Sequence, residues 1–160
     1  MSMFYHSTRG GGDSVTSRQA ILAGIAPDGG LYVSDQLGAS ELGVEGLEAA
    51  GYHGIARRVL ATLLPDFSPD ELDDCVRGAY AQNFDTPLVT PVTSLGDDWL
   101  LELWHGPTCA FKDLALQMLP RLMSRSREED GRRIMIVTAT SGDTGKAALA
   151  GFARAVRSYW

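Results

Sequence analysis

Two lysines, Lys112 and Lys146, could support covalent chemistry in this chain. The chain has 14 basic residues, and all except these two are arginine. A lysine amine can lose its proton and attack a carbonyl carbon, whereas an arginine guanidinium stays protonated. Both lysines lie in glycine-bearing segments of the C-terminal half. A compositional bias toward arginine explains the count equally well without any function.

Lys112 follows Phe111 and opens a predicted helix, after a predicted strand at 99–104 and a turn at 105–108. A cation at the positive end of a helix dipole is disfavoured, which favours the neutral, nucleophilic amine. The alternative is a solvated lysine of the first helical turn that pairs with Asp113 or Glu102.

Residues 140–146 read Thr-Ser-Gly-Asp-Thr-Gly-Lys, between a predicted buried strand and a predicted helix. Such a turn presents backbone N–H groups and the positive end of the helix to a phosphate or carboxylate. A nucleotide P-loop is excluded, because the leading glycine is missing and Ala147 stands where Ser or Thr is needed. A dinucleotide fingerprint is absent too. The alternative is that Ser141 and Asp143 only cap the helix.

The first half predicts a small helical unit. Helices are expected at 17–25, where Thr16 and Gln19 have capping-box spacing, and around 43–64. A second capping box is predicted at Ser68, with Pro69 in the first turn and Glu71 three residues after the cap. The next helix carries an apolar face at Leu72, Cys75, Val76, Ala79 and Tyr80. Residues 86–91, with two prolines, indicate a hinge or boundary.

The second half alternates strands and helices. After the strand at 99–104, a helix from Lys112 should kink or start late at Pro120. The apolar run 134–137 predicts a strand buried on both faces, followed by a helix through residue 156. This order predicts the opening of an open α/β sheet. The expected domains are 1–90, a small helical unit, and 91–160, the start of an α/β domain.

Composition excludes several function classes. The 160 residues carry a formal charge of −6, which argues against broad nucleic-acid binding. No apolar run approaches the roughly 18 residues of a membrane helix, so no membrane partner is expected. The two cysteines, Cys75 and Cys109, make neither a disulfide framework nor a metal cluster. We therefore expect no metal site and a cytoplasmic location.

Four segments together resemble one family. Residues 102–113 read Glu-Leu-Trp-His-Gly-Pro-Thr-Cys-Ala-Phe-Lys-Asp, and residues 138–148 carry the hydroxyl-rich turn described above. Residues 5–10 read Tyr-His-Ser-Thr-Arg-Gly, and residues 26–33 read Ala-Pro-Asp-Gly-Gly-Leu-Tyr-Val. In this order they are similar to the N-terminal portion of the threonine synthase family. Ser34 and Cys109 depart from the usual family residues, away from the proposed chemistry.

The resemblance implies a tryptophan-synthase-like fold and the cofactor pyridoxal 5'-phosphate. The implied reaction is a carbon–oxygen lyase reaction that converts O-phospho-L-homoserine and water into L-threonine and inorganic phosphate. Lys112 would bind the cofactor and move protons at the substrate carbons, and Phe111 would pack near the cofactor ring. His105 belongs to the motif, but a turn explains it equally well, and Lys146 lies outside the motif core. The implied substrate-binding residues are Ser141, Gly142, Asp143, Thr144 and Gly145.

After Phe152 the sequence no longer resembles the family. The family's cofactor-phosphate loop and the residue facing the pyridine nitrogen lie further downstream. We therefore expect an incomplete N-terminal portion that is inactive alone. The alternatives are a truncated or frameshifted remnant that acts at most as a binding module, and a serine or threonine dehydratase of the same fold. The N-terminal segments 5–10 and 26–33 argue against the dehydratase.

Overall fold

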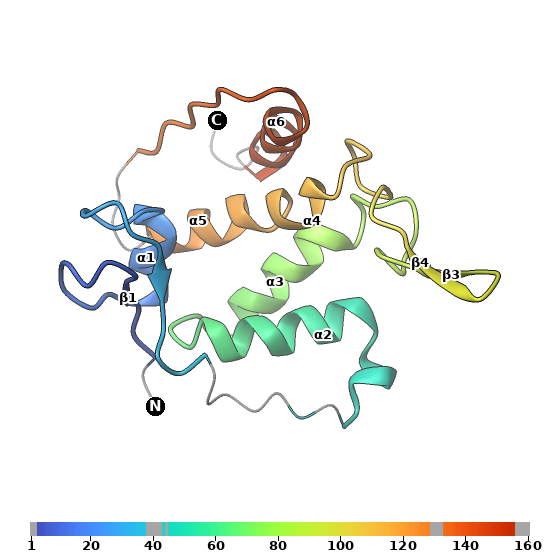
Figure 1. Cartoon of the computed structure of the whole chain (residues 1–160), viewed down its shortest axis with the longest axis horizontal. Helices are drawn as coiled ribbons and strands as arrows, with labels where there is room; N and C mark the ends of the chain where they lie inside the picture. Colours follow the sequence, from blue (N-terminus) through green and yellow to red (C-terminus); the bar gives the residue numbers. More distant parts are fainter. Residues whose placement is uncertain (1–2, 38–42, 44, 129–132, 156–160) are drawn as a thin grey trace.

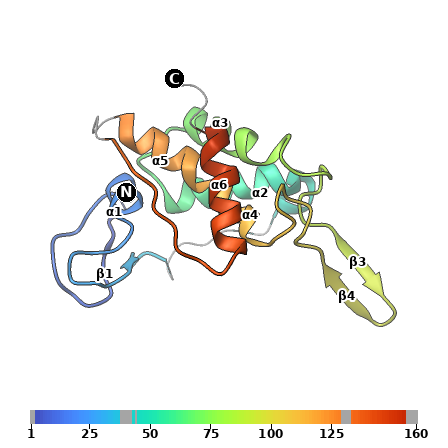
Figure 2. The same ribbon diagram turned by 90° about the horizontal axis from the view of Figure 1, so that it is seen from above.

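The chain forms a helical body from which a two-stranded hairpin projects (Figure 1 and Figure 2). The structure is a computed structural model that describes residues 3–37, 43, 45–128 and 133–155. The elements, in chain order, are β1 His6–Ser7, α1 Ser17–Ala23, β2 Tyr32–Val33, α2 Leu47–Leu63, α3 Pro69–Tyr80, β3 Val92–Leu95, β4 Asp98–Leu101, α4 Lys112–Leu116, α5 Leu119–Glu128 and α6 Asp143–Ala155.

The predicted capping boxes start two helices. The Thr16 side chain accepts the backbone N–H of Gln19 at the start of α1, while the Gln19 side chain accepts the N–H of Thr16. Ser68 and Glu71 make the same reciprocal pair at the start of α3. Helix α1 ends at Ala23, two residues earlier than expected, because Gly24 adopts a φ of 71° and closes the helix.

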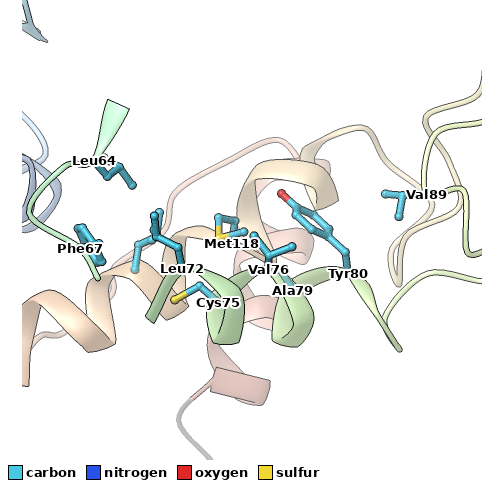
Figure 3. Packing of buried hydrophobic residues seen from close by; sticks show 10 residues of the cluster. Leu64, Phe67, Leu72, Cys75, Val76, Ala79, Tyr80, Val89 and Met118 are labelled. Atoms are coloured by element: carbon cyan, nitrogen blue, oxygen red, sulfur yellow. The ribbon is translucent and has the colours of Figure 1, made fainter. Parts of the chain in front are cut away.

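One apolar core surrounds α3 (Figure 3). All five residues of the predicted apolar face of α3 are buried. Leu64 and Phe67 join them from the loop before α3, and Met118 and Leu122 join them from the second half of the chain. Cys75 is a free thiol in this core, and burial raises its pKa to about 11. The core therefore draws residues from both sides of the expected boundary at residue 90.

Helix α2 packs on this core through its partly buried residues Tyr52, Ala56 and Leu60. The helix is interrupted near its start, because Gly51 has a φ of 58° and a ψ of 179°. The late start predicted from Pro120 is also observed. A helix from Lys112 stops at Leu116, and α5 begins at Leu119, with Pro120 in its first turn.

The hairpin pairs β3 with β4 in antiparallel register, from Val92 opposite Leu101 to Leu95 opposite Asp98. Gly96, with a φ of 63°, opens its two-residue turn. The strand predicted at 99–104 is therefore only partly correct: it spans 98–101, and all eight strand residues are exposed. A second antiparallel pair joins β1 to β2 near the N-terminus.

The buried strand predicted at 134–137 is wrong for this chain. The segment forms no strand, and Ile134, Met135, Ile136 and Val137 expose 39%, 85%, 41% and 81% of their surface. A strand needs a neighbour for its backbone hydrogen bonds, and none of the described residues pairs with this segment.

None of the described helices is both long and apolar enough to span a membrane. Within the same ranges, no three His, Cys, Asp or Glu side chains are grouped as metal ligands would be.

Candidate active site

Lys112 begins helix α4, and its Nζ atom lies over the ring of Phe111, 3.8 Å from the ring centroid. Lys112 is half-buried, and Phe111 exposes 57% of its surface. The two predicted site residues are therefore in contact. Because α4 has only five residues, it aligns few peptide dipoles at Lys112, and the dipole argument made from the sequence is weakened.

The carboxylates expected to pair with Lys112 have other partners. Asp113 is fully buried and accepts hydrogen bonds from the backbone N–H and the hydroxyl of Thr108, both at 2.8 Å. Glu102 accepts a hydrogen bond from the Thr93 hydroxyl at 2.6 Å. Within the described residues, Lys112 forms no ion pair. The alternative of a lysine paired with Asp113 or Glu102 is therefore not what the structure shows.

Asp113 shapes the turn that leads to Lys112. Gly106 packs so closely on it that an added Cβ would lie 2.5 Å from the Asp113 Cβ. Cys109 has a φ of 56°, which is uncommon for a residue with a side chain. The sequence indicated Asp113 only as a possible ion-pair partner of Lys112, and not as a residue that shapes the turn. The available signal was an acidic residue in the first turn of a helix, five residues after a threonine.

The turn before α6 presents backbone donors to solvent. The Thr140 hydroxyl accepts the backbone N–H groups of Gly142 at 3.0 Å and Gly145 at 3.1 Å. Thr140, rather than Ser141 or Asp143, therefore supplies the cap, and the sequence reasoning missed it. Among the described residues, the N–H groups of Asp143 and Thr144 have no acceptor.

Two glycines of this turn have an unusual backbone conformation or tight surroundings. Gly142 has a φ of 151°, a conformation that side chains disfavour. A Cβ on Gly145 would meet the Thr140 hydroxyl oxygen at 3.3 Å. All five predicted substrate residues belong to this turn, and all except the half-buried Gly145 are exposed. The arrangement is suited to binding a carboxylate or a phosphate.

Helices α4 and α6 lie side by side (Figure 1 and Figure 2). Gly151 of α6 packs directly against the backbone carbonyl of Leu116 at the end of α4, and against Pro120. The structure thus brings together the two helices that carry the predicted site residues. Lys112 makes no hydrogen bond to residues 141–145 among the described residues. Lys146 is exposed, and its backbone N–H donates to the Gly142 carbonyl.

A cavity of about 650 Å³ lies between α1, α5 and α6. Its lining is mostly apolar and includes Leu116, Met123 and Ile136. Thr144 reaches it from the candidate turn, whereas Lys112 is not part of its lining.

The chain, with a lysine at a helix start beside a helix that opens on a glycine- and hydroxyl-rich turn, is similar to solved structures of threonine synthases. A threonine synthase of Brucella melitensis, solved with pyridoxal phosphate bound, matches with a TM-score of 0.86 and 38% identity, over 94% of this chain and 33% of that one. The yeast threonine synthase matches with a TM-score of 0.82 and 30% identity. These matches confirm the predicted fold class.

The sequence comparisons agree with the structural ones. The family model for the threonine synthase N terminus matches residues 4–80. The threonine synthase of Pseudomonas aeruginosa is 40% identical over 158 residues, which cover 95% of this chain and 33% of that protein. The chain is therefore similar to the N-terminal portion of threonine synthase, as its motifs indicated. It spans about a third of the length of these relatives.

Proposed function

We propose that this chain forms the N-terminal part of a threonine synthase, a pyridoxal-phosphate-dependent lyase. The reaction would convert O-phospho-L-homoserine and water into L-threonine and phosphate. The observation that carries the proposal is the amine of Lys112, which lies at the start of α4 over the Phe111 ring. Relatives named threonine synthase match nearly the whole chain around it.

The residues around Lys112 fit the cofactor. A primary amine that is not held in an ion pair is available to react with the aldehyde of the cofactor. Within the described residues, the amine of Lys112 is in no ion pair. The exposed Phe111 ring beside it offers an apolar face for a planar ring. When bound, the cofactor supplies an electron sink for bond cleavage at the substrate carbons.

Each side chain then has a separate task. Lys112 would hold the cofactor by its amine and would move a proton at the substrate carbons. The N–H groups of Asp143 and Thr144, with the hydroxyl of Ser141, bind the substrate carboxylate. Asp113 keeps Lys112 oriented by fixing the turn before it.

Covalent labelling tests the lysine assignment. The chain is mixed with pyridoxal phosphate and reduced with borohydride, and the modified lysine is located by mass spectrometry. We expect the label on Lys112. The Lys112→Arg variant should lose it, and the matched control Lys146→Arg should keep it. A label on Lys146, or no label, contradicts the proposal.

Activity is a separate test. We propose that the chain alone releases little or no phosphate from O-phospho-L-homoserine, since it spans 31–33% of the length of the relatives. Turnover at rates typical of enzymes, roughly 1 per second or faster, would contradict this part. Free serine and threonine serve as the comparison substrates for a dehydratase.

A further inference from the structure

His105 lies between two carboxylates. Its Nδ1 atom is 2.5 Å from Asp85 Oδ1, and its Nε2 atom is 2.6 Å from Glu102 Oε2. The side chains of His105 and Glu102 expose only 16% and 17% of their surface, while Asp85 exposes 73%. The Trp104 ring stacks on the imidazole, with the ring centroids 5.6 Å apart.

This arrangement selects the protonated imidazole. An ionised carboxylate only accepts hydrogen bonds, and a neutral imidazole has a single N–H to donate. Both contacts are satisfied together only when both ring nitrogens carry a proton. In agreement, the hydrogen bonds to Glu102 and then to Asp85 raise the pKa of His105 above its usual 6.5. The Thr93 hydroxyl and His105 lower the pKa of Glu102.

The two carboxylates belong to different segments of the chain. Asp85 lies in the segment that leaves α3, and its backbone N–H also donates to the carbonyl of His105 at 3.0 Å. Glu102 directly follows β4, and its N–H donates to the carbonyl of Pro91 at 2.9 Å. His105 therefore joins the segment after α3, the hairpin and the turn that leads to Lys112.

A short, rigid path connects His105 to the reactive lysine. Gly106, the next residue, packs against Asp113, which accepts two hydrogen bonds from Thr108. Asp113 is in turn the neighbour of Lys112 in α4. A displacement at His105 is therefore passed to Lys112 by a turn with little freedom to absorb it.

We propose that His105 is a positioning residue for Lys112, which it holds in place by bridging Asp85 and Glu102. The inference deepens the proposed function, since it concerns the same lysine, and it uses a histidine to which the motif resemblance assigned no task. The bridge exists while the imidazole is charged and the two carboxylates are ionised. It is lost as the pH rises through the raised pKa of His105.

Nuclear magnetic resonance tests the bridge without any cofactor. In the full chain, we expect the titration midpoint of His105 to lie above its usual 6.5, with both ring nitrogens protonated below that midpoint. Glu102→Gln should lower this midpoint, because it removes one charge and keeps the shape of the side chain. A midpoint at or below 6.5, or a midpoint that Glu102→Gln leaves unchanged, overturns the proposal.

Competitive acetylation tests the link to Lys112. The chain has only two lysines, so the ratio of Lys112 to Lys146 modified by acetic anhydride has an internal reference. We expect His105→Gln to change this ratio several-fold, on the order of 3 to 10 times. The matched control is His6→Gln. His6 is a histidine next to a single carboxylate, with its Nε2 atom 3.5 Å from Asp35 Oδ1.

The dependence on pH separates positioning from a loss of fold. In the wild-type chain the ratio should shift across the titration midpoint of His105, and in His105→Gln it should stay flat. An unchanged ratio in His105→Gln, or an equal change in His6→Gln, overturns the proposal. Because neither readout contains pyridoxal phosphate, failure of the cofactor proposal leaves this test intact.

Discussion

The core around α3 and the segment at 134–137 bury their apolar side chains to opposite extents. Leu72 and Ala79 expose 1% and 0% of their surface, whereas Met135 and Val137 expose 85% and 81%. An amphipathic helix buries one apolar face against the elements that pack on it. A strand that is apolar on both faces needs covering layers and neighbouring strands. Hydrophobic side chains are therefore buried in the first region and exposed in the second.

The candidate site has one part next to each region. Lys112 begins α4. Leu114 of the same helix packs against the α3 core, and Met118, which follows the helix, lies within that core. The 141–145 turn follows the exposed segment and is connected to the core through α6. We infer that the lysine side of the site is held more firmly than the anion-binding side.

The largest effect is expected from a cavity in the α3 core. Leu72→Ala should lower the free energy of unfolding by about 2–5 kcal/mol, the usual range for a buried leucine. Urea unfolding followed by circular dichroism measures the loss. Leu149→Ala is the matched control, because Leu149 exposes 69% of its surface. Equal losses in both variants would contradict the contrast between buried and exposed leucines.

An intermediate effect is expected where α6 meets α4. Gly151→Ala forces a methyl group into the Leu116 carbonyl, an overpacking that costs about 1–3 kcal/mol. The cost should appear as faster amide hydrogen exchange in α6, with the rates in α3 unchanged. Ala153→Ser, at an exposed position of α6, is the control. Faster exchange throughout the chain would show that α6 and the α3 core unfold together.

The smallest effect is expected in the exposed segment. Met135→Ser should change the free energy of unfolding by less than about 0.5 kcal/mol, because the side chain is already in water. The same urea titration measures it. A loss comparable with that of Leu72→Ala would mean that Met135 is covered in solution.

Local rules explain what the sequence predicted well. The two capping boxes, the late start of α5 and the apolar face of α3 depend on residues within a few positions of one another. Lys112 was correctly expected at the start of a helix for the same reason. The comparisons confirm the resemblance to threonine synthase. Four motifs indicated it, in residues 5–10, 26–33, 102–113 and 138–148.

Only the tertiary structure decided the partners of the polar side chains and the fate of residues 134–137. His105 meets Asp85 across 20 residues, a pairing that no local pattern encodes. Asp113 accepts hydrogen bonds from Thr108 and does not pair with Lys112, although Thr108 and Lys112 are both close to it in the sequence. A strand requires hydrogen bonds from another segment. The apolar composition of residues 134–137 was therefore not enough to decide their conformation.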